Sequence, residues 1–197
     1  MENLDYSLFF FINNTLRNHY FTAIAPYWRN MFFWLPLYVF LITFIFQKFK
    51  AKAGIILLGA IITIALSDTV SSKIIKPYFK RDRPCNQVTI QNKVHLLVPP
   101  SSGYSFPSSH AANHFALVFF LFGFEPFRKT WIKTSFIFWA ASISIAQVYV
   151  GLHYPVDIFF GALIGILIGW SVSAIISNFV LRSSNFQSPQ KVLTAQK

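Results

Sequence analysis

Of the 197 residues, 54% are hydrophobic and only 12% are charged, whereas about a quarter of the residues are charged in an average soluble domain. This composition excludes an ordinary soluble protein and predicts a membrane protein of one domain. The net charge of +11, from 17 basic and 6 acidic residues, indicates an anionic partner, either lipid headgroups or a phosphate substrate, and the position of the basic residues on loops between apolar segments argues against nucleic acid. The single cysteine, Cys85, excludes an internal disulfide and a cysteine-rich metal site.

The first 30 residues mix apolar side chains with asparagine, arginine and histidine, which predicts an amphipathic helix at the membrane interface. Segments suited to crossing a membrane follow: 31–46, one that begins with the apolar residues 53–66 and has a polar latter half at 67–73, 108–124, 131–150 and 155–181. The sequence thus predicts an all-α polytopic bundle of about five transmembrane spans plus the N-terminal interfacial helix, or six spans if that helix also crosses. We expect one domain over residues 1–181 and a polar, disordered tail over 182–197.

One long loop, residues 76–106, separates the second and third apolar segments, and loops of this length in a compact protein are usually functional or disordered. With five crossings, this loop, the start of the third segment and the turn around His153 fall on one side of the membrane. Basic residues at the other ends of the spans, such as Lys50 and Arg128, make the opposite side cytoplasmic by the positive-inside rule. The loop side holds more basic residues still, which conflicts with this rule, and we assign those residues to a substrate site. We therefore expect a multi-pass cell-membrane protein whose site lies on the extracytoplasmic face.

Small residues in the last apolar segment favour close helix packing. Gly161 and Gly165 are four residues apart, and such a small-xxx-small face lets two helix backbones approach in a membrane. We expect this face to contact another helix of the bundle.

The turn before the last apolar segment carries His153 and Asp157. Pro155 suits the first position of the helix that follows, which places Tyr154 at its cap and Asp157 in its first turn. From there Asp157 can reach one ring nitrogen of His153, fix its tautomer and leave the lone pair of the other nitrogen exposed, as a nucleophile requires. Taken alone, the same residues fit equally well a helix start with a favourable acid in its first turn.

Two further stretches hold groups suited to an anion. Lys76 and Arg83 are cations with six residues between them, and arginine gives planar bidentate hydrogen bonds where lysine gives a point charge; alone, they fit a solvated basic loop. Ser108, Ser109 and His110 begin the third segment, where free backbone N–H groups and the positive helix end favour an anion. His110 can supply a proton to a leaving oxygen, although this stretch alone also fits a serine N-cap beside an interfacial histidine.

In order, spacing and position, the three stretches resemble the signature of the type 2 phosphatidic acid phosphatase (PAP2) family: Lys-x6-Arg-Pro, Pro-Ser-Gly-His and Ser-Arg-x5-His-x3-Asp. The resemblance covers residues 76–157 at motif level and implies a metal-independent phosphatase, without cofactors, that forms a phosphohistidine. It implies that His153 attacks phosphorus, that Asp157 orients it and that His110 protonates the leaving group. The residues that would hold the phosphoryl oxygens are Lys76, Arg83, Ser108 and, through its amide, Ser109.

Three positions depart from that signature. Ser109 stands at the motif glycine, a mild change if the backbone N–H does the work. Ala146 and Gln147 stand at the motif Ser-Arg, so the site loses one formal charge where the family places a phosphate-binding arginine, although the glutamine amide can still donate a hydrogen bond. We expect a phosphate pocket one cation short, in which an added arginine tightens anion binding unless Lys80 or Arg81 compensates. A weakened enzyme is the alternative.

These features predict a membrane lipid-phosphate phosphatase, because a site at headgroup depth with apolar walls suits an amphiphile. Undecaprenyl diphosphate, phosphatidic acid, phosphatidylglycerol phosphate and lipid A phosphate all fit, and small members of the family often act on the first. One alternative is a membrane protein that binds an anionic lipid without turnover, which Gln147 favours and the two histidines oppose. Another is a transporter or channel, which needs broken helices and mid-membrane charges; only Asp68 and Lys73 point that way, and an internal pair near a site also explains them.

Overall fold

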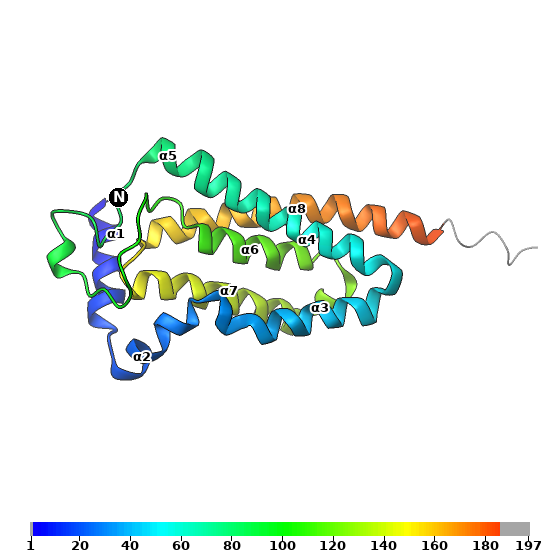
Figure 1. The fold of residues 1–197 in the computed structure, drawn as a ribbon, viewed down its shortest axis with the longest axis horizontal. Coiled ribbons are helices and arrows are strands. Elements are labelled where there is room, and N and C mark those ends of the chain that lie inside the picture. Colours follow the sequence, from blue (N-terminus) through cyan, green and yellow to red (C-terminus); the bar gives the residue numbers. More distant parts are fainter. Residues whose placement is uncertain (1, 186–197) are drawn as a thin grey trace, which may run out of the picture.

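The computed structural model describes residues 2–185, which fold into helices and connecting loops and contain no strand within that range (Figure 1). The α-helices are α1 (Glu2–Phe10), α2 (His19–Trp28), α3 (Leu35–Phe49), α4 (Ala53–Asp68), α5 (Lys76–Phe79), α6 (Ser109–Leu121), α7 (Thr130–Tyr149) and α8 (Pro155–Asn185). A π-helical segment, Thr69–Ile75, joins α4 to α5 without a break in the helix. The five long apolar segments predicted from the sequence are therefore present as α3, α4, α6, α7 and α8.

The five long helices lie side by side in an elongated bundle, with α1, α2 and the long loop gathered at one end (Figure 1). Helices α6 and α8 pack most closely. Three glycines of α8 each face a backbone carbonyl of the α6 segment so closely that an added Cβ would overlap with it: Gly161, Gly165 and Gly169. The predicted small-residue contact is confirmed, and its partner is α6.

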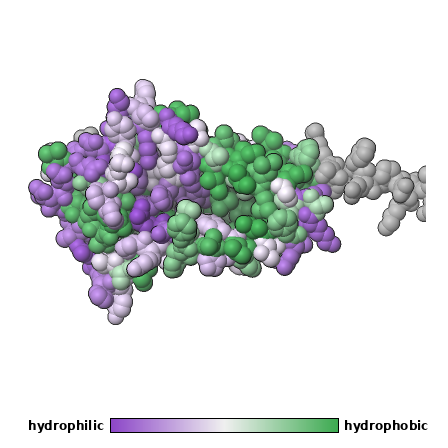
Figure 2. All heavy atoms as spheres, viewed as in Figure 1, coloured by the Kyte–Doolittle hydropathy of each residue, from purple (hydrophilic) through white to green (hydrophobic). Residues whose placement is uncertain are grey.

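On the face shown in Figure 2, apolar residues gather over the helical bundle and polar residues over the end that carries the loop. Phe40, Ile61 and Trp170 are each more than 60% exposed, although they are large hydrophobic side chains. In the described part of the chain, two helical segments are long and apolar enough to cross a membrane, Met31–Phe79 and Pro155–Val180. The first contains α3 and α4, which run in opposite directions around a turn at residues 50–52 (Figure 1). This distribution suits contact with lipid, because lipid chains are as apolar as these side chains.

Three predicted boundaries differ from the structure. The loop begins at Lys80, because the helix of α4 continues through the polar residues 67–73 to Phe79, so Lys76 is a helical residue. The N-terminal segment forms two helices, α1 and α2, where one was expected. Helix α8 runs to Asn185, four residues into the predicted tail, and the rest of that tail lies outside the described residues.

Candidate active site

A polar cavity of about 190 Å³ lies at the end of the bundle that carries the long loop. Its walls come from the end of α2, the α4–α5 helix, the loop, the start of α6, the end of α7 and the turn before α8. The lining residues are Arg29, Ser72, Lys76, Arg83, Ser101, Ser109, His110, Gln147, Leu152 and His153. Six of the eight predicted site residues are among them, so the three motifs meet in space as the sequence indicated.

The turn that presents His153 depends on a glycine. Gly151 has φ +88°, and an added Cβ would lie 2.8 Å from Val94 Cγ1 and 3.2 Å from the carbonyl oxygen of His95 in the long loop. Both the backbone angle and the lack of space therefore require glycine. The amides of Leu152 and His153 donate to the carbonyl of Gln147, which ties the turn to the last turn of α7.

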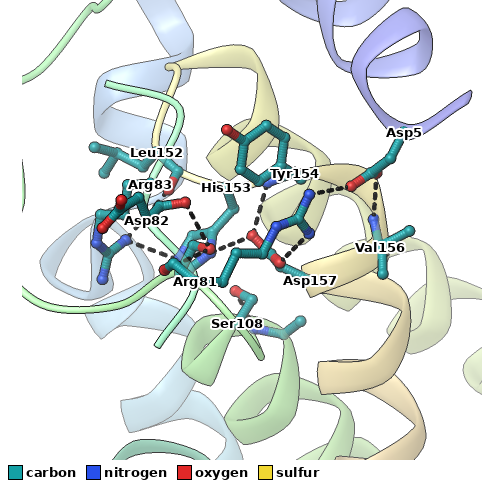
Figure 3. A network of polar contacts seen from close by, with 12 residues as sticks. Asp5, Arg81, Asp82, Arg83, Ser108, Leu152, His153, Tyr154, Val156 and Asp157 are labelled. Atoms are coloured by element: carbon teal, nitrogen blue, oxygen red, sulfur yellow. Dashed lines mark hydrogen bonds and ion pairs between the residues drawn. The ribbon is translucent and has the colours of Figure 1, made fainter. Parts of the chain in front are cut away.

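Asp157 lies behind His153, fully buried, in the first turn of α8 (Figure 3). Its Oδ2 is 3.4 Å from His153 Nδ1 and accepts a 2.9 Å hydrogen bond from the amide of Tyr154. Its Oδ1 accepts a 2.8 Å hydrogen bond from Arg81 Nη1. Asp157 thus has both roles considered from the sequence, since it caps the start of α8 and faces the ring of His153.

The other ring nitrogen of His153 faces the cavity and carries the lone pair. His153 Nε2 lies 3.1 Å from Arg83 Nη1, and a guanidinium can only donate, so Nε2 accepts and the ring proton sits on Nδ1, toward Asp157. Burial lowers the pKa of His153 to about 4, although Asp157 raises it in part. His153 is therefore a neutral imidazole at neutral pH, in the tautomer that a nucleophile attacking through Nε2 needs.

Among the described residues, no carboxylate lines the cavity and three cations do: Arg29, Lys76 and Arg83. Arg83 is 6% exposed, and its hydrogen bonds within residues 2–185 go to the carbonyls of Gly103 and Leu152 and to His153. Burial lowers the pKa of Arg83, yet a guanidinium stays charged in a protein. A buried positive charge without a carboxylate partner leaves the cavity ready for an anion.

The start of α6 contributes backbone donors and a histidine. The first amides of a helix lack intrahelical acceptors, so those of Ser109 and His110 are available to an anion. Ser109 Oγ lies 2.9 Å from Ser72 Oγ and accepts from Ser71 Oγ, which leaves the backbone as its main contribution. Ser108 is fully buried, does not line the cavity, and its hydroxyl accepts from the amide of Ala111 as an N-cap. Ser108, which was expected to bind phosphate, is therefore the N-cap of α6 in the structure.

The cavity is not one cation short. Arg29, at the end of α2, donates from Nε to Gln147 Oε1 over 3.1 Å. Arg81, one of the two neighbours expected to compensate, instead joins Asp157 to Asp5 and lies 3.9 Å over the ring of Tyr154 (Figure 3). The other, Lys80, is exposed at the end of α5. The expected charge deficit is thus not seen in the cavity lining, where Arg29 lies beside Gln147.

The charges proposed for a mid-membrane pathway do not form an internal pair. Lys73 is exposed. Asp68 Oδ1 accepts from Ser72 Oγ and Asn113 Nδ2, and no ion pair links Asp68 to Lys73 in the part of the chain that the structure describes. The Asp68 carboxylate therefore holds Ser72, which lines the cavity, and Asn113 of α6.

The family comparison agrees with this geometry, because the PAP2 superfamily matches residues 52–181, which include every residue of the three motifs. The chain belongs to the PAP2 superfamily. The lipid A 4'-phosphatase of Bacteroides thetaiotaomicron is 31% identical over 173 residues, which cover 86% of this chain and 76% of that protein. The undecaprenyl-diphosphatase of Sulfolobus acidocaldarius is 30% identical over 142 residues, or 72% of this chain and 62% of its own length.

Solved PAP2 structures share the fold. The crystal structure of Aquifex aeolicus LpxE covers 89% of this chain and 95% of its own, with a TM-score of 0.64 and 29% sequence identity. A PAP2-type phosphatidylglycerolphosphate phosphatase of Bacillus subtilis superposes with a TM-score of 0.68 at 21% identity, which bears on the fold alone. The all-helical membrane architecture and the assignment to a family of phosphatases are confirmed.

Three site residues escaped the sequence analysis: Asp5, Arg29 and Arg81 in its role beside Asp157. Asp5 is 3% exposed, pairs with Arg81 and accepts a 2.9 Å hydrogen bond from the amide of Val156. Through these contacts α1 becomes part of the site. Asp5, an acid in a segment rich in asparagine and phenylalanine, carries no signal in the sequence. The missing arginine at Gln147, in contrast, did indicate that a cation was needed from elsewhere.

Proposed function

We propose that this PAP2 protein is an integral membrane lipid-phosphate phosphatase that works through a phosphohistidine on His153. The observation that carries the proposal is the arrangement around His153 Nε2, a neutral nitrogen whose lone pair accepts from Arg83 in the wall of a cavity with three cations and a second histidine. Binding alone requires the cations. An oriented nucleophile, backed by Asp157 and facing His110, is needed only for chemistry at phosphorus.

In the first step, the Nε2 lone pair of His153 forms a bond to phosphorus while the bond from phosphorus to the leaving oxygen breaks. The electron pair of that bond goes to the leaving oxygen, and His110 gives it a proton. The phosphoryl oxygens are held by Lys76, Arg83 and the first amides of α6. This fits the general physics of phosphoryl transfer, in which catalysis is mainly positioning and charge stabilisation by fixed donors.

In the second step, water attacks the phosphorus of the phosphohistidine and the nitrogen–phosphorus bond breaks. The electron pair returns to Nε2, and the neutral His110 accepts the proton that the water loses, so both histidines end as they began. Asp157 holds the proton of His153 Nδ1 on its own side throughout. Neither step requires a metal ion, and we propose that the enzyme works without one.

For the membrane arrangement, we propose five crossings by α3, α4, α6, α7 and α8, with α1 and α2 at the interface. The turns α3–α4 and α6–α7 lie at the end of the bundle opposite the site (Figure 1), and both carry basic residues, among them Lys50, Lys52, Arg128 and Lys129. The positive-inside rule makes that end cytoplasmic. The cavity then opens on the extracytoplasmic face at headgroup depth.

An apolar hollow of about 680 Å³ between α2 and α7 supports an amphiphilic substrate. Trp28 and Ala146 line the hollow, and the next residues along the chain, Arg29 and Gln147, line the polar cavity. A lipid whose phosphate enters the cavity can therefore place an apolar chain in the hollow. The substrates that fit are undecaprenyl diphosphate, phosphatidic acid, phosphatidylglycerol phosphate and lipid A phosphate, and the relatives named above favour the first and the last.

The hollow can be tested by filling it. Ala141 lines it, so we expect Ala141→Phe to raise KM for a long-chain lipid phosphate and to leave hydrolysis of p-nitrophenyl phosphate, which has no chain, unchanged. Ala174, exposed on α8, gives the matched control Ala174→Phe. An equal loss on both substrates would mean that the hollow is not the chain site.

The function itself is tested by phosphate release from purified protein given the four lipid phosphates in turn. We expect turnover of at least one, and none by His153→Ala of the same fold. The alternative, an anionic-lipid-binding protein, predicts that wild type and His153→Ala bind these lipids equally and that neither releases phosphate.

A further inference from the structure

The cavity holds an arginine that comes from outside the family signature. Gln147 stands at the position of the motif arginine, and Arg29 lies beside it, 118 residues away along the chain, with Nε donating to Gln147 Oε1 over 3.1 Å. Both residues line the same cavity as Arg83 and His153. Arg29 also lies outside the segment that matches the family, residues 52–181.

We propose that Arg29 is a substrate-phosphate-binding residue that replaces the arginine missing at position 147. This inference rests on the proposed function, because it assigns a further residue to the same phosphate site. The ligand is a phosphoryl group, which a planar guanidinium holds through two parallel hydrogen bonds.

Contacts of the neighbouring Trp28 hold Arg29 close to α7. Trp28 Nε1 donates to Ser142 Oγ over 2.9 Å, and Trp34 Nε1 donates to the carbonyl of Trp28 over 2.7 Å. The two indoles also meet edge to face, with centroids 4.6 Å apart. Ser142 and Gln147 lie on the same helix about 7.5 Å apart along its axis, so Trp28 and Arg29 contact α7 at successive points and hold the end of α2 against it.

Gln147 lies between Arg29 and the cavity and links the two. Its side chain is fully buried, and its Oε1 accepts from Arg29 while its Nε2 has no hydrogen-bond partner in the described residues. A buried amide nitrogen without an acceptor is costly, and here it belongs to a cavity wall. An oxygen of a bound phosphate satisfies it. Gln147 thus fixes the arginine on one side and donates to the anion on the other.

The charge of Arg29 has no anionic partner among the described residues. Among residues 2–185 no carboxylate forms an ion pair with Arg29, and Nε is its only side-chain nitrogen with a hydrogen bond there. Burial and the neighbouring charge of Arg83 lower the pKa of Arg29. Two like charges facing one cavity repel each other, and a phosphate dianion between them removes that repulsion.

The inference is tested by the binding of orthovanadate to detergent-purified protein, measured by isothermal titration calorimetry at one salt concentration. We expect Arg29→Ala to weaken binding on the order of 10- to 100-fold, the effect of losing charge-assisted hydrogen bonds. Arg29→Lys keeps the charge but lacks the planar guanidinium, and its affinity for vanadate should lie between those of the wild type and Arg29→Ala. Arg17→Ala removes an exposed arginine from the same N-terminal segment and should bind as wild type does.

Moving the arginine back gives the sharper result. In Arg29→Ala/Gln147→Arg the charge returns to the family position, and we expect affinity to recover most of the loss. Gln147→Arg alone adds a fourth cation beside Arg29, and we expect affinity to stay flat or fall. Wild-type affinity in Arg29→Ala and Arg29→Lys, both folded by circular dichroism, would overturn the inference, as would tighter binding by Gln147→Arg alone.

This measurement separates the inference from the proposed function. Vanadate binds without turnover, so a wild-type protein that releases no phosphate from any lipid but loses vanadate affinity in Arg29→Ala refutes the enzyme and keeps Arg29 as an anion ligand. Full lipid phosphatase activity and wild-type vanadate affinity in Arg29→Ala would keep the enzyme and reject Arg29.

Discussion

The contact between Asp5 and Arg81 makes the N-terminal helix part of the catalytic domain, and its strength can be measured. Asp5 Oδ2 accepts from Arg81 Nη2, and Asp5 Oδ1 accepts from the amide of Val156 at the start of α8 (Figure 3). Asp5 is 3% and Arg81 25% exposed, so solvent screens the pair only in part. Without Asp5, Arg81 and hence Asp157 lose their anchor.

The expected magnitude follows from the two hydrogen bonds. A hydrogen bond between charged groups contributes about 1.5–3 kcal/mol, and the loss of an acceptor at a helix start costs about 0.5–2 kcal/mol. Asp5→Ala should therefore lower the free energy of unfolding by about 2–5 kcal/mol. Asp5→Asn keeps an acceptor for Val156 and should lose only the part due to Arg81.

A double-mutant cycle isolates the pair. The free energy of unfolding is measured by titrating mixed micelles with sodium dodecyl sulfate for wild type, Asp5→Ala, Arg81→Ala and the double variant. Arg81→Ala and the double variant both lack the Arg81–Asp157 contact, so its free energy cancels in the coupling energy. We expect a coupling of about 1.5–3 kcal/mol. A coupling within about 0.5 kcal/mol of zero, the error of such cycles, would refute a structural bond between α1 and the site.

Two further predictions concern the chemistry. Since burial lowers the pKa of His153 to about 4, its imidazole should be neutral at about pH 5.5, where an unperturbed histidine is mostly protonated. The ¹⁵N chemical shifts of histidine-labelled protein measure this charge state, with the His153 signal assigned by comparison with His153→Ala. A protonated His153 ring at that pH would contradict the burial argument. Phosphatase activity should persist in excess EDTA. Among the described residues, no carboxylate lines the cavity and no group of three or more His, Cys, Asp or Glu could hold a metal ion. Loss of activity in EDTA that magnesium or zinc restores would exclude the proposed mechanism.

The long helices could be predicted from the sequence because each is a continuous apolar segment. Pro155 at the first position of α8 fixed its start, and the spacing from His153 to Asp157 required only one helical turn. The end of the second span was harder. The loop was expected to begin at residue 76, but a π-helical turn continues the helix to Phe79, and Pro77 lies in the first turn of α5, where no amide donor is needed.

Contacts between distant segments account for what the sequence did not predict. Arg29 and Gln147 meet because Trp28 anchors α2 on α7, and nothing near either residue in the chain announces the partner. Arg81 follows the same logic. Its position in a basic run suggested a phosphate ligand, whereas buried Asp157 and Asp5, from opposite ends of the chain, hold it in the structure. Local spacing identified the motifs, and tertiary packing decided which charges face the cavity.

The central claim is that His153 becomes phosphorylated, and trapping that intermediate tests it most directly. The purified protein is mixed with a radiolabelled lipid phosphate, quenched in alkali, in which phosphohistidine survives, and digested for mass spectrometry. The account predicts label on the peptide that contains His153 in the wild type and in Arg17→Ala, and none in His153→Ala. Phosphate release without any labelled peptide, or label that persists on another residue in His153→Ala, would contradict it.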